Sequence, residues 1–113
     1  MALALNVFKT ITTVVSTSPV GIYTAPVGYT GVVLLAQCAN IGNQTQTVSF
    51  SHQRTTAGIA VTTEILKNFP IESSDTANLL SGKLVLESGD ALVISSTSGN
   101  DVKFLGSILE TLS

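Results

Sequence analysis

The segment LLSGKLVLESGDALVISS, residues Leu79–Ser96, holds the clearest strand pattern in this chain. It contains two short apolar runs, Lys83–Leu86 and Ala91–Ser95, in which side chains alternate as they do along a β-strand. The residues between them, Glu87–Asp90, predict a tight turn, because Gly89 can take a positive φ and an aspartate readily bonds its own backbone. We therefore predict a hairpin made of strand, turn and strand.

The residues before this segment show a similar rhythm of strands and turns. Ala2–Ser16 is rich in Val, Ile and Thr and predicts either one long strand or two short ones. Val20–Ala25 predicts a short strand, and Pro26 ends it because proline cannot donate to a ladder. Thr30–Ala39 is an almost continuous apolar run, which predicts a central strand that is covered on both faces or meets a neighbouring subunit on its outer face.

The middle of the chain predicts a second hairpin. Thr45–Arg54 alternates: Val48, Phe50 and His52 lie on one face, and Ser49, Ser51 and Gln53 lie on the other. A turn at residues 55–58 leads to Ile59–Phe69, which also alternates but changes phase at Leu66, as it would at a bulge. Residues 73–78 then predict a polar connection.

The chain ends in Val102–Leu112, whose spacing fits either a strand or a helix. Gly106 would cost a helix about 1 kcal/mol, so we predict a strand. Eight or nine short strands with turns about every ten residues are typical of an antiparallel all-β sandwich, and a jelly-roll arrangement fits best. We expect one domain over residues 1–113, with residues 1–9 as a candidate N-terminal arm.

The composition is poor in charge. Charged residues make up 11% of the chain against a usual ~25%, while the hydrophobic fraction is 44% and the net charge is −2. This pattern fits either a neutral, hydroxyl-rich surface or a surface that faces other subunits. The five Lys and Arg residues are scattered, so we expect no nucleic-acid partner. We also expect no membrane-spanning helix and no signal peptide.

The sequence gives no pattern of catalytic, cofactor-binding or metal-ligating residues. The one histidine, His52, lies in phase with Val48 and predicts a half-buried strand residue rather than a catalytic base. The one cysteine, Cys38, lies in an apolar run and predicts a buried, reduced side chain. Glu87 and Asp90 flank a turn and predict turn formers with solvated side chains. We therefore predict that the protein is not an enzyme and has no cofactor.

Three segments resemble a known family. The segments Ile22–Thr30, Val32–Asn40 and Leu79–Asp90 contain the patterns Y-T-A-P-x-G-x-T, an apolar strand ending in Asn, and L-x-G-K-L-V-L-x-x-G-D, and T-V-S-F at residues 47–50 lies between the second and the third. In this order they resemble small virion structural proteins of tailed bacteriophages, in particular those of T4-like phages that infect marine cyanobacteria. The resemblance implies a non-enzymatic β-sandwich on the phage particle, assembled in the host bacterial cytoplasm.

The resemblance and the charge-poor composition together predict a protein that binds copies of itself, as a homotrimer, and other virion proteins. We expect a capsid decoration or cement protein; the alternative is a neck, tail or fibre component that binds a host glycan through loops. The candidate subunit-contact residues are Ala2, Leu3, Leu5, Val7, Val32, Val33, Leu34 and Leu35, which are more apolar than one buried face requires. Tyr23 and Tyr29 flank a turn and are the candidate loop-binding residues.

Overall fold

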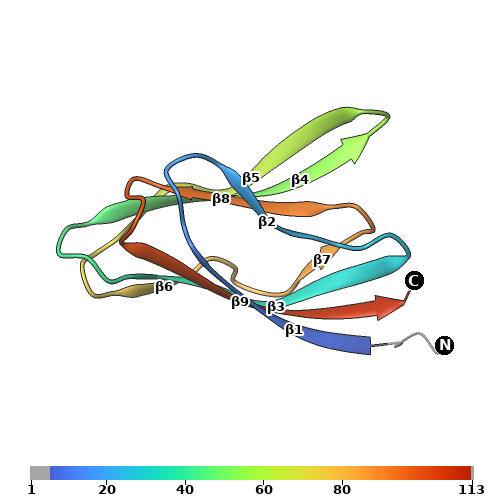
Figure 1. Cartoon of the computed structure of the whole chain (residues 1–113), viewed down its shortest axis with the longest axis horizontal. Helices are drawn as coiled ribbons and strands as arrows, with labels where there is room; N and C mark the ends of the chain where they lie inside the picture. Colours follow the sequence, from blue (N-terminus) through green and yellow to red (C-terminus); the bar gives the residue numbers. More distant parts are fainter. Residues whose placement is uncertain (1–5, 113) are drawn as a thin grey trace.

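The computed structural model describes residues 6–112, which form two antiparallel sheets packed face to face (Figure 1). In chain order the strands are β1 (Asn6–Val14), β2 (Val20–Thr24), β3 (Tyr29–Asn40), β4 (Gln46–Thr56), β5 (Ile59–Ile71), β6 (Thr76–Asn78), β7 (Leu84–Leu86), β8 (Ala91–Ser96) and β9 (Val102–Leu112). The first sheet has the order β1-β9-β3-β6, with β7 also paired to β3, and the second has the order β2-β8-β4-β5. The predicted sandwich of eight or nine strands is confirmed.

The strand order is that of one long hairpin rolled into a jelly roll. The chain folds back at Ala57 and Gly58, which both have positive φ (54° and 79°), as a two-residue hairpin turn requires. From this turn outward, β4 pairs β5, β3 pairs β6 and β7, β2 pairs β8, and β1 pairs β9, all antiparallel. Successive pairs lie alternately in the second and the first sheet, which is the jelly-roll arrangement.

The hairpin predicted for Leu79–Ser96 is wrong. Its first strand, β7, pairs with β3 in the first sheet, and its second strand, β8, pairs with β2 and β4 in the second sheet. The turn itself forms as expected: the Asp90 amide donates to the Glu87 carbonyl, and Gly89 has a φ of 88°. However, the turn crosses between sheets beside the β2–β3 connection, where the Gly89 amide donates to the Ala25 carbonyl and the Ala25 amide to the Asp90 carbonyl. Pairing of β7 and β8 with strands far from them in the sequence therefore outweighed the local pattern that predicted a hairpin.

The other strand predictions hold with one omission. The β4–β5 hairpin is present, and its register shifts around Leu66 where a bulge was predicted. Val102–Leu112 is a strand, and β1 is a single strand rather than two. The polar connection predicted at residues 73–78 contains the short strand β6, which pairs with residues 37–39. Three residues are too few for a strand pattern to be visible in the sequence.

The core lies between the sheets and is built from alternate residues of each strand. On β4 the buried apolar side chains are Val48 and Phe50, as the alternation predicted, and Ser49 lies on the outer face; Ser51, on the same face as Ser49, is also buried. The Phe50 ring stacks with Phe104 of the first sheet, with 6.1 Å between ring centroids. Cys38 is fully buried, and burial raises the pKa of its thiol to about 12.

Polar contacts also join the two sheets, and one of them involves a predicted site residue. The Tyr23 hydroxyl on β2 donates to Glu110 Oε2 on β9 at 2.5 Å, and Lys9 Nζ lies 3.2 Å from Glu110 Oε1. Burial and the hydrogen bond to Glu110 raise the pKa of Tyr23. Because its side chain points between the sheets and bonds Glu110, Tyr23 does not project from the loop as a candidate loop-binding residue would.

Replacing Tyr23 with phenylalanine is expected to lower the free energy of unfolding by about 1.5–3 kcal/mol, since the buried Glu110 carboxylate loses a charge-assisted hydrogen bond. Urea unfolding at fixed protein concentration measures this change. A loss below about 0.5 kcal/mol, the range of ordinary surface substitutions, would contradict this role of the hydroxyl.

Candidate subunit-contact surface

The outer face of the first sheet carries a row of four apolar side chains across four adjacent strands. Phe8 on β1 is paired with Leu109 on β9, Leu109 with Val32 on β3, and Val32 with Val85 on β7. Their chain neighbours Val33, Ile108 and Leu86 are buried in the core, so by strand alternation the four residues of this apolar row face outward. Phe8 is 75% exposed and Val85 is 55% exposed. The two ends of the apolar row are therefore uncovered in a single copy of the described chain, and Val32 and Leu109 between them are partly exposed.

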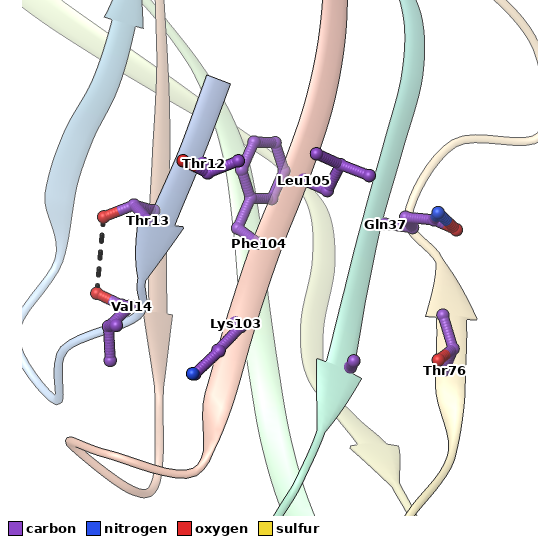
Figure 2. Close-up of a pocket in the computed structure, with 9 residues that line it drawn as sticks. Thr12, Thr13, Val14, Gln37, Thr76, Lys103, Phe104 and Leu105 are labelled. Atoms are coloured by element: carbon purple, nitrogen blue, oxygen red, sulfur yellow. Dashed lines mark hydrogen bonds between the residues drawn. The ribbon is translucent and has the colours of Figure 1, made fainter. Parts of the chain in front are cut away.

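The rest of this face is nearly uncharged and hollowed. Among the described residues that alternate onto it, Lys103 is the one charged side chain. Away from the apolar row lies a hollow of about 630 Å³, lined by Thr12 and Val14 of β1, Lys103 and Leu105 of β9, Gln37 of β3 and Thr76 of β6, together with Thr13, Ala39 and Phe104. Figure 2 shows the β1 residues on one side of β9, and Gln37 and Thr76 on the other.

The outer face of the second sheet is different. Its outward rows include the pairs Ser49 with Ser95 and Gln53 with Ala91, so polar and small side chains dominate there. A hydroxyl-rich surface, one of the two alternatives that fit the composition, thus lies on one face of the molecule, and an apolar surface lies on the opposite face. A nearly uncharged face with exposed aliphatic and aromatic side chains is typical of a protein–protein contact.

The structure places only some of the predicted contact residues on the outer face of the first sheet. Val32 lies in the apolar row, and Leu35 faces outward beside it, paired with Ser107. Leu34 is partly exposed at a bulge in β3, whereas Val33 is buried in the core and cannot reach a partner. Val7 is paired with Glu110 and so lies on the inner side of β1. Ala2, Leu3 and Leu5 lie outside the described residues.

Phe8, Leu109 and Val85 were not among the predicted contact residues. A signal for Val85 is present in the sequence, because Leu84, Val85 and Leu86 are all apolar although a half-buried strand needs only alternate apolar residues. Phe8 lay within the predicted arm but was not singled out. The register of the sheet, which the sequence does not give, brings them into one row.

The buried carboxylate of Asp90 lies in the turn where the chain crosses from β7 in the first sheet to β8 in the second sheet. Arg54 Nε donates to Asp90 Oδ1 at 2.9 Å and Arg54 Nη2 to Asp90 Oδ2 at 2.6 Å, while the Glu87 amide donates to Oδ2 at 3.0 Å. His52 Nε2 also lies 3.0 Å from Asp90 Oδ2. The hydrogen bonds from Arg54, followed by those from His52 and the Glu87 amide, hold the pKa of Asp90 well below its usual range despite burial.

This cluster confirms His52 as a half-buried, hydrogen-bonded strand residue and corrects the prediction for Asp90. Glu87 is solvated as expected, but Asp90 is only 2% exposed. The positively charged group that pairs with Asp90 is the Arg54 guanidinium. The sequence did not suggest this pair, because Arg54 is 36 residues away from Asp90. Within residues 6–112 no group of three or more His, Cys, Asp or Glu side chains is placed to hold a metal ion.

Acid is expected to destabilise the protein through Asp90. Its pKa is lower in the folded state than the unfolded value of about 3.9, so the stabilisation is complete above about pH 5 and is lost as the pH falls through that value toward the folded pKa. Urea unfolding from pH 7 to pH 3 should show a steeper loss for the wild type than for Asp90→Asn. Parallel pH dependences would contradict this assignment.

No protein-family model matches the sequence, and no curated protein sequence matches it. The described chain also contains no helix of the length and apolar character that a membrane crossing needs.

Several solved structures share the fold. A chain of the infectious bursal disease virus particle superposes with a TM-score of 0.59 at 12% identity, covering 96% of this chain but only 31% of that chain, so this chain spans about a third of its length. A chain from the capsid structure of Helicobacter pylori bacteriophage KHP30 gives a TM-score of 0.57 at 15% identity and covers 96% of this chain and 89% of that chain.

A chain of the disulfide-linked Bacillus endospore appendages gives a TM-score of 0.51 at 16% identity and covers 100% of this chain and 97% of that chain. All three likenesses concern the fold. They show that this jelly roll has the fold of chains found in virus particles and in a surface appendage.

Proposed function

We propose that this protein is a non-enzymatic structural subunit of a bacteriophage particle, and within that class a capsid decoration or cement protein that associates as a trimer and binds other virion proteins. The observation that carries the proposal is the apolar row on the nearly uncharged outer face of the first sheet. Such a face is costly in a free monomer and stabilising when another subunit covers it.

The solved structures support the proposal at the level of the fold. The KHP30 capsid chain has nearly the same length as this one, so a jelly roll of this size occurs as a whole chain in a phage capsid structure. The proposal places the protein near the virion proteins of T4-like cyanophages, which its sequence resembles. Assembly in a bacterial cytoplasm agrees with Cys38 being a buried thiol.

The Bacillus appendages are a less suitable parallel. They are described as disulfide-linked pili, whereas the one cysteine of this chain is buried in the core. A disulfide between subunits would require Cys38 to leave the core. Contacts between copies of this protein are therefore proposed to be non-covalent.

A second candidate is a neck, tail or fibre component that binds a host glycan. The hollow beside Lys103 favours this candidate, because Thr12, Gln37 and Thr76 there offer hydroxyl and amide groups of the kind that bind sugars. An array of bacterial surface glycans, probed with the intact oligomer, tests it. Binding that is lost in Gln37→Ala would support it, and the absence of binding would reject it.

The self-association is tested by the mass of the purified protein in solution, measured by light scattering behind a sizing column. We expect a discrete species of three times the 11.7 kDa chain mass. A monomer at tens of micromolar would reject self-association and would leave the low charge as a property of the free surface.

A further inference from the structure

The β4–β5 hairpin extends beyond the body of the sandwich (Figure 1). The pairing of β4 with β8 ends at Gln53, whereas its pairing with β5 continues to the turn at Thr56 and Ile59. Residues 54–61 thus form a two-stranded distal ribbon that has no further strand beside it within the described chain. A two-stranded ribbon without cover is marginally stable in water.

The distal ribbon has one apolar side. Ile59 and Val61 are paired with Thr56 and Arg54, which alternate in phase with the core residue Phe50. They therefore continue the apolar inner side of the second sheet past the end of the core. Ile59 is 68% exposed and Val61 is 60% exposed, so this side is uncovered.

The edge of β5 is protected along only half of its length. Near the body, the bulge at Leu66, the charge of Lys67 and the proline Pro70 all hinder pairing with another chain. Residues 59–63, IAVTT, contain no charge, proline or glycine, and no bulge interrupts their pairing with β4. The unprotected half is the half that projects.

The base of the distal ribbon is held to the body. Arg54, the first residue of the ribbon, makes two hydrogen bonds to buried Asp90 and one to Glu87. The ribbon therefore leaves the sandwich in a fixed direction and presents Ile59 and Val61 in a set orientation. Such preorganisation lowers the entropic cost of binding.

We propose that the distal ribbon of one copy packs, through Ile59 and Val61, on the apolar row of a second copy; this rests on the self-association proposed above. The two surfaces cannot meet within one molecule, because the apolar row lies on the outer face of the first sheet and the ribbon belongs to the second sheet. Neither surface has an ionisable group apart from Arg54, which Asp90 already pairs, so their contact buries no unpaired charge.

The contact is head-to-tail, since it joins different surfaces of two identical subunits. Contacts of this type close into rings when the rotation allows, and a three-membered ring is the proposed trimer. In such a ring each subunit contributes both surfaces, its ribbon to one neighbour and its apolar row to the other.

Cysteine cross-linking tests the contact. In the full chain, the double variants Val61→Cys/Val85→Cys and Ile59→Cys/Val85→Cys are treated with a short bismaleimide, while buried Cys38 is expected not to react. We expect covalent oligomers from both. The matched control is Ala60→Cys/Val85→Cys, because Ala60 lies on the opposite side of the ribbon and should cross-link at least tenfold less.

Other outcomes would overturn the proposal. Cross-linked dimers from Val61→Cys alone would show that two ribbons meet each other instead. An oligomeric protein without Val61–Val85 or Ile59–Val85 cross-links would overturn the ribbon contact and leave self-association intact, whereas a monomeric wild type would overturn both. As a second measurement, Ile59→Lys should weaken association at least tenfold and Ala60→Lys should not; equal effects would contradict the proposal.

Discussion

Replacing Asp90 with alanine is expected to lower the free energy of unfolding by about 3–5 kcal/mol, the range for breaking a buried ion pair. The Asp90 carboxylate accepts two hydrogen bonds from Arg54 and one from the Glu87 amide, and it contacts His52. It therefore joins β4 to the crossing between the two sheets. Urea unfolding at neutral pH and fixed protein concentration measures the loss.

The control for this prediction is Glu87→Ala. Glu87 also contacts Arg54, at 3.0 Å, but its side chain is solvated, and surface ion pairs contribute about 0–1 kcal/mol. The expected ratio of the two effects is therefore at least threefold. Equal effects of Asp90→Ala and Glu87→Ala would contradict this prediction. They would mean that the buried Asp90 carboxylate stabilises the fold no more than the solvated Glu87 carboxylate does.

Replacing Val85 with lysine is expected to weaken self-association at least 100-fold, which corresponds to about 3 kcal/mol. Val85 ends the apolar row and is exposed in the single chain, so the change should leave folding nearly unaffected while it places an unpaired charge in the proposed contact. Light scattering over a concentration series gives the association constant.

The chain offers a matched control at Val27. Val27 is also an exposed valine, but it lies in the β2–β3 loop, outside the apolar row. Val27→Lys adds the same charge to the whole molecule and should leave the oligomer unchanged. Dissociation by both variants would point to a general effect of charge, and dissociation by neither would exclude Val85 from the contact.

The sequence predicted the strands well, apart from β6, because each of the other strands carries its own pattern. The alternation around Val48 and Phe50, the turn at residues 55–58 and the phase change at Leu66 are local signals, and all three features are present. The pairing of β7 and β8 was mispredicted because the Glu87–Asp90 turn has the same backbone geometry in a hairpin and in a crossing between sheets.

The contact surface could be predicted only in part. Val32 was found because its strand is apolar on both faces, but the row that joins it to Phe8 and Val85 depends on the register of four strands. The burial of Asp90 was missed for the same reason, since its partner Arg54 comes from the centre of the chain. Sequence patterns show which faces are apolar, and long-range pairing decides which residues meet.

Binding to virus particles that lack this protein tests the proposed function most directly. The purified wild type is titrated onto such particles, and the bound protein is quantified after sedimentation, with Val85→Lys and Val27→Lys in parallel. The proposal predicts saturable binding of a discrete oligomer at a fixed ratio to the major capsid protein, weakened by Val85→Lys and unchanged by Val27→Lys. A well-behaved monomer that does not bind the particles would contradict it.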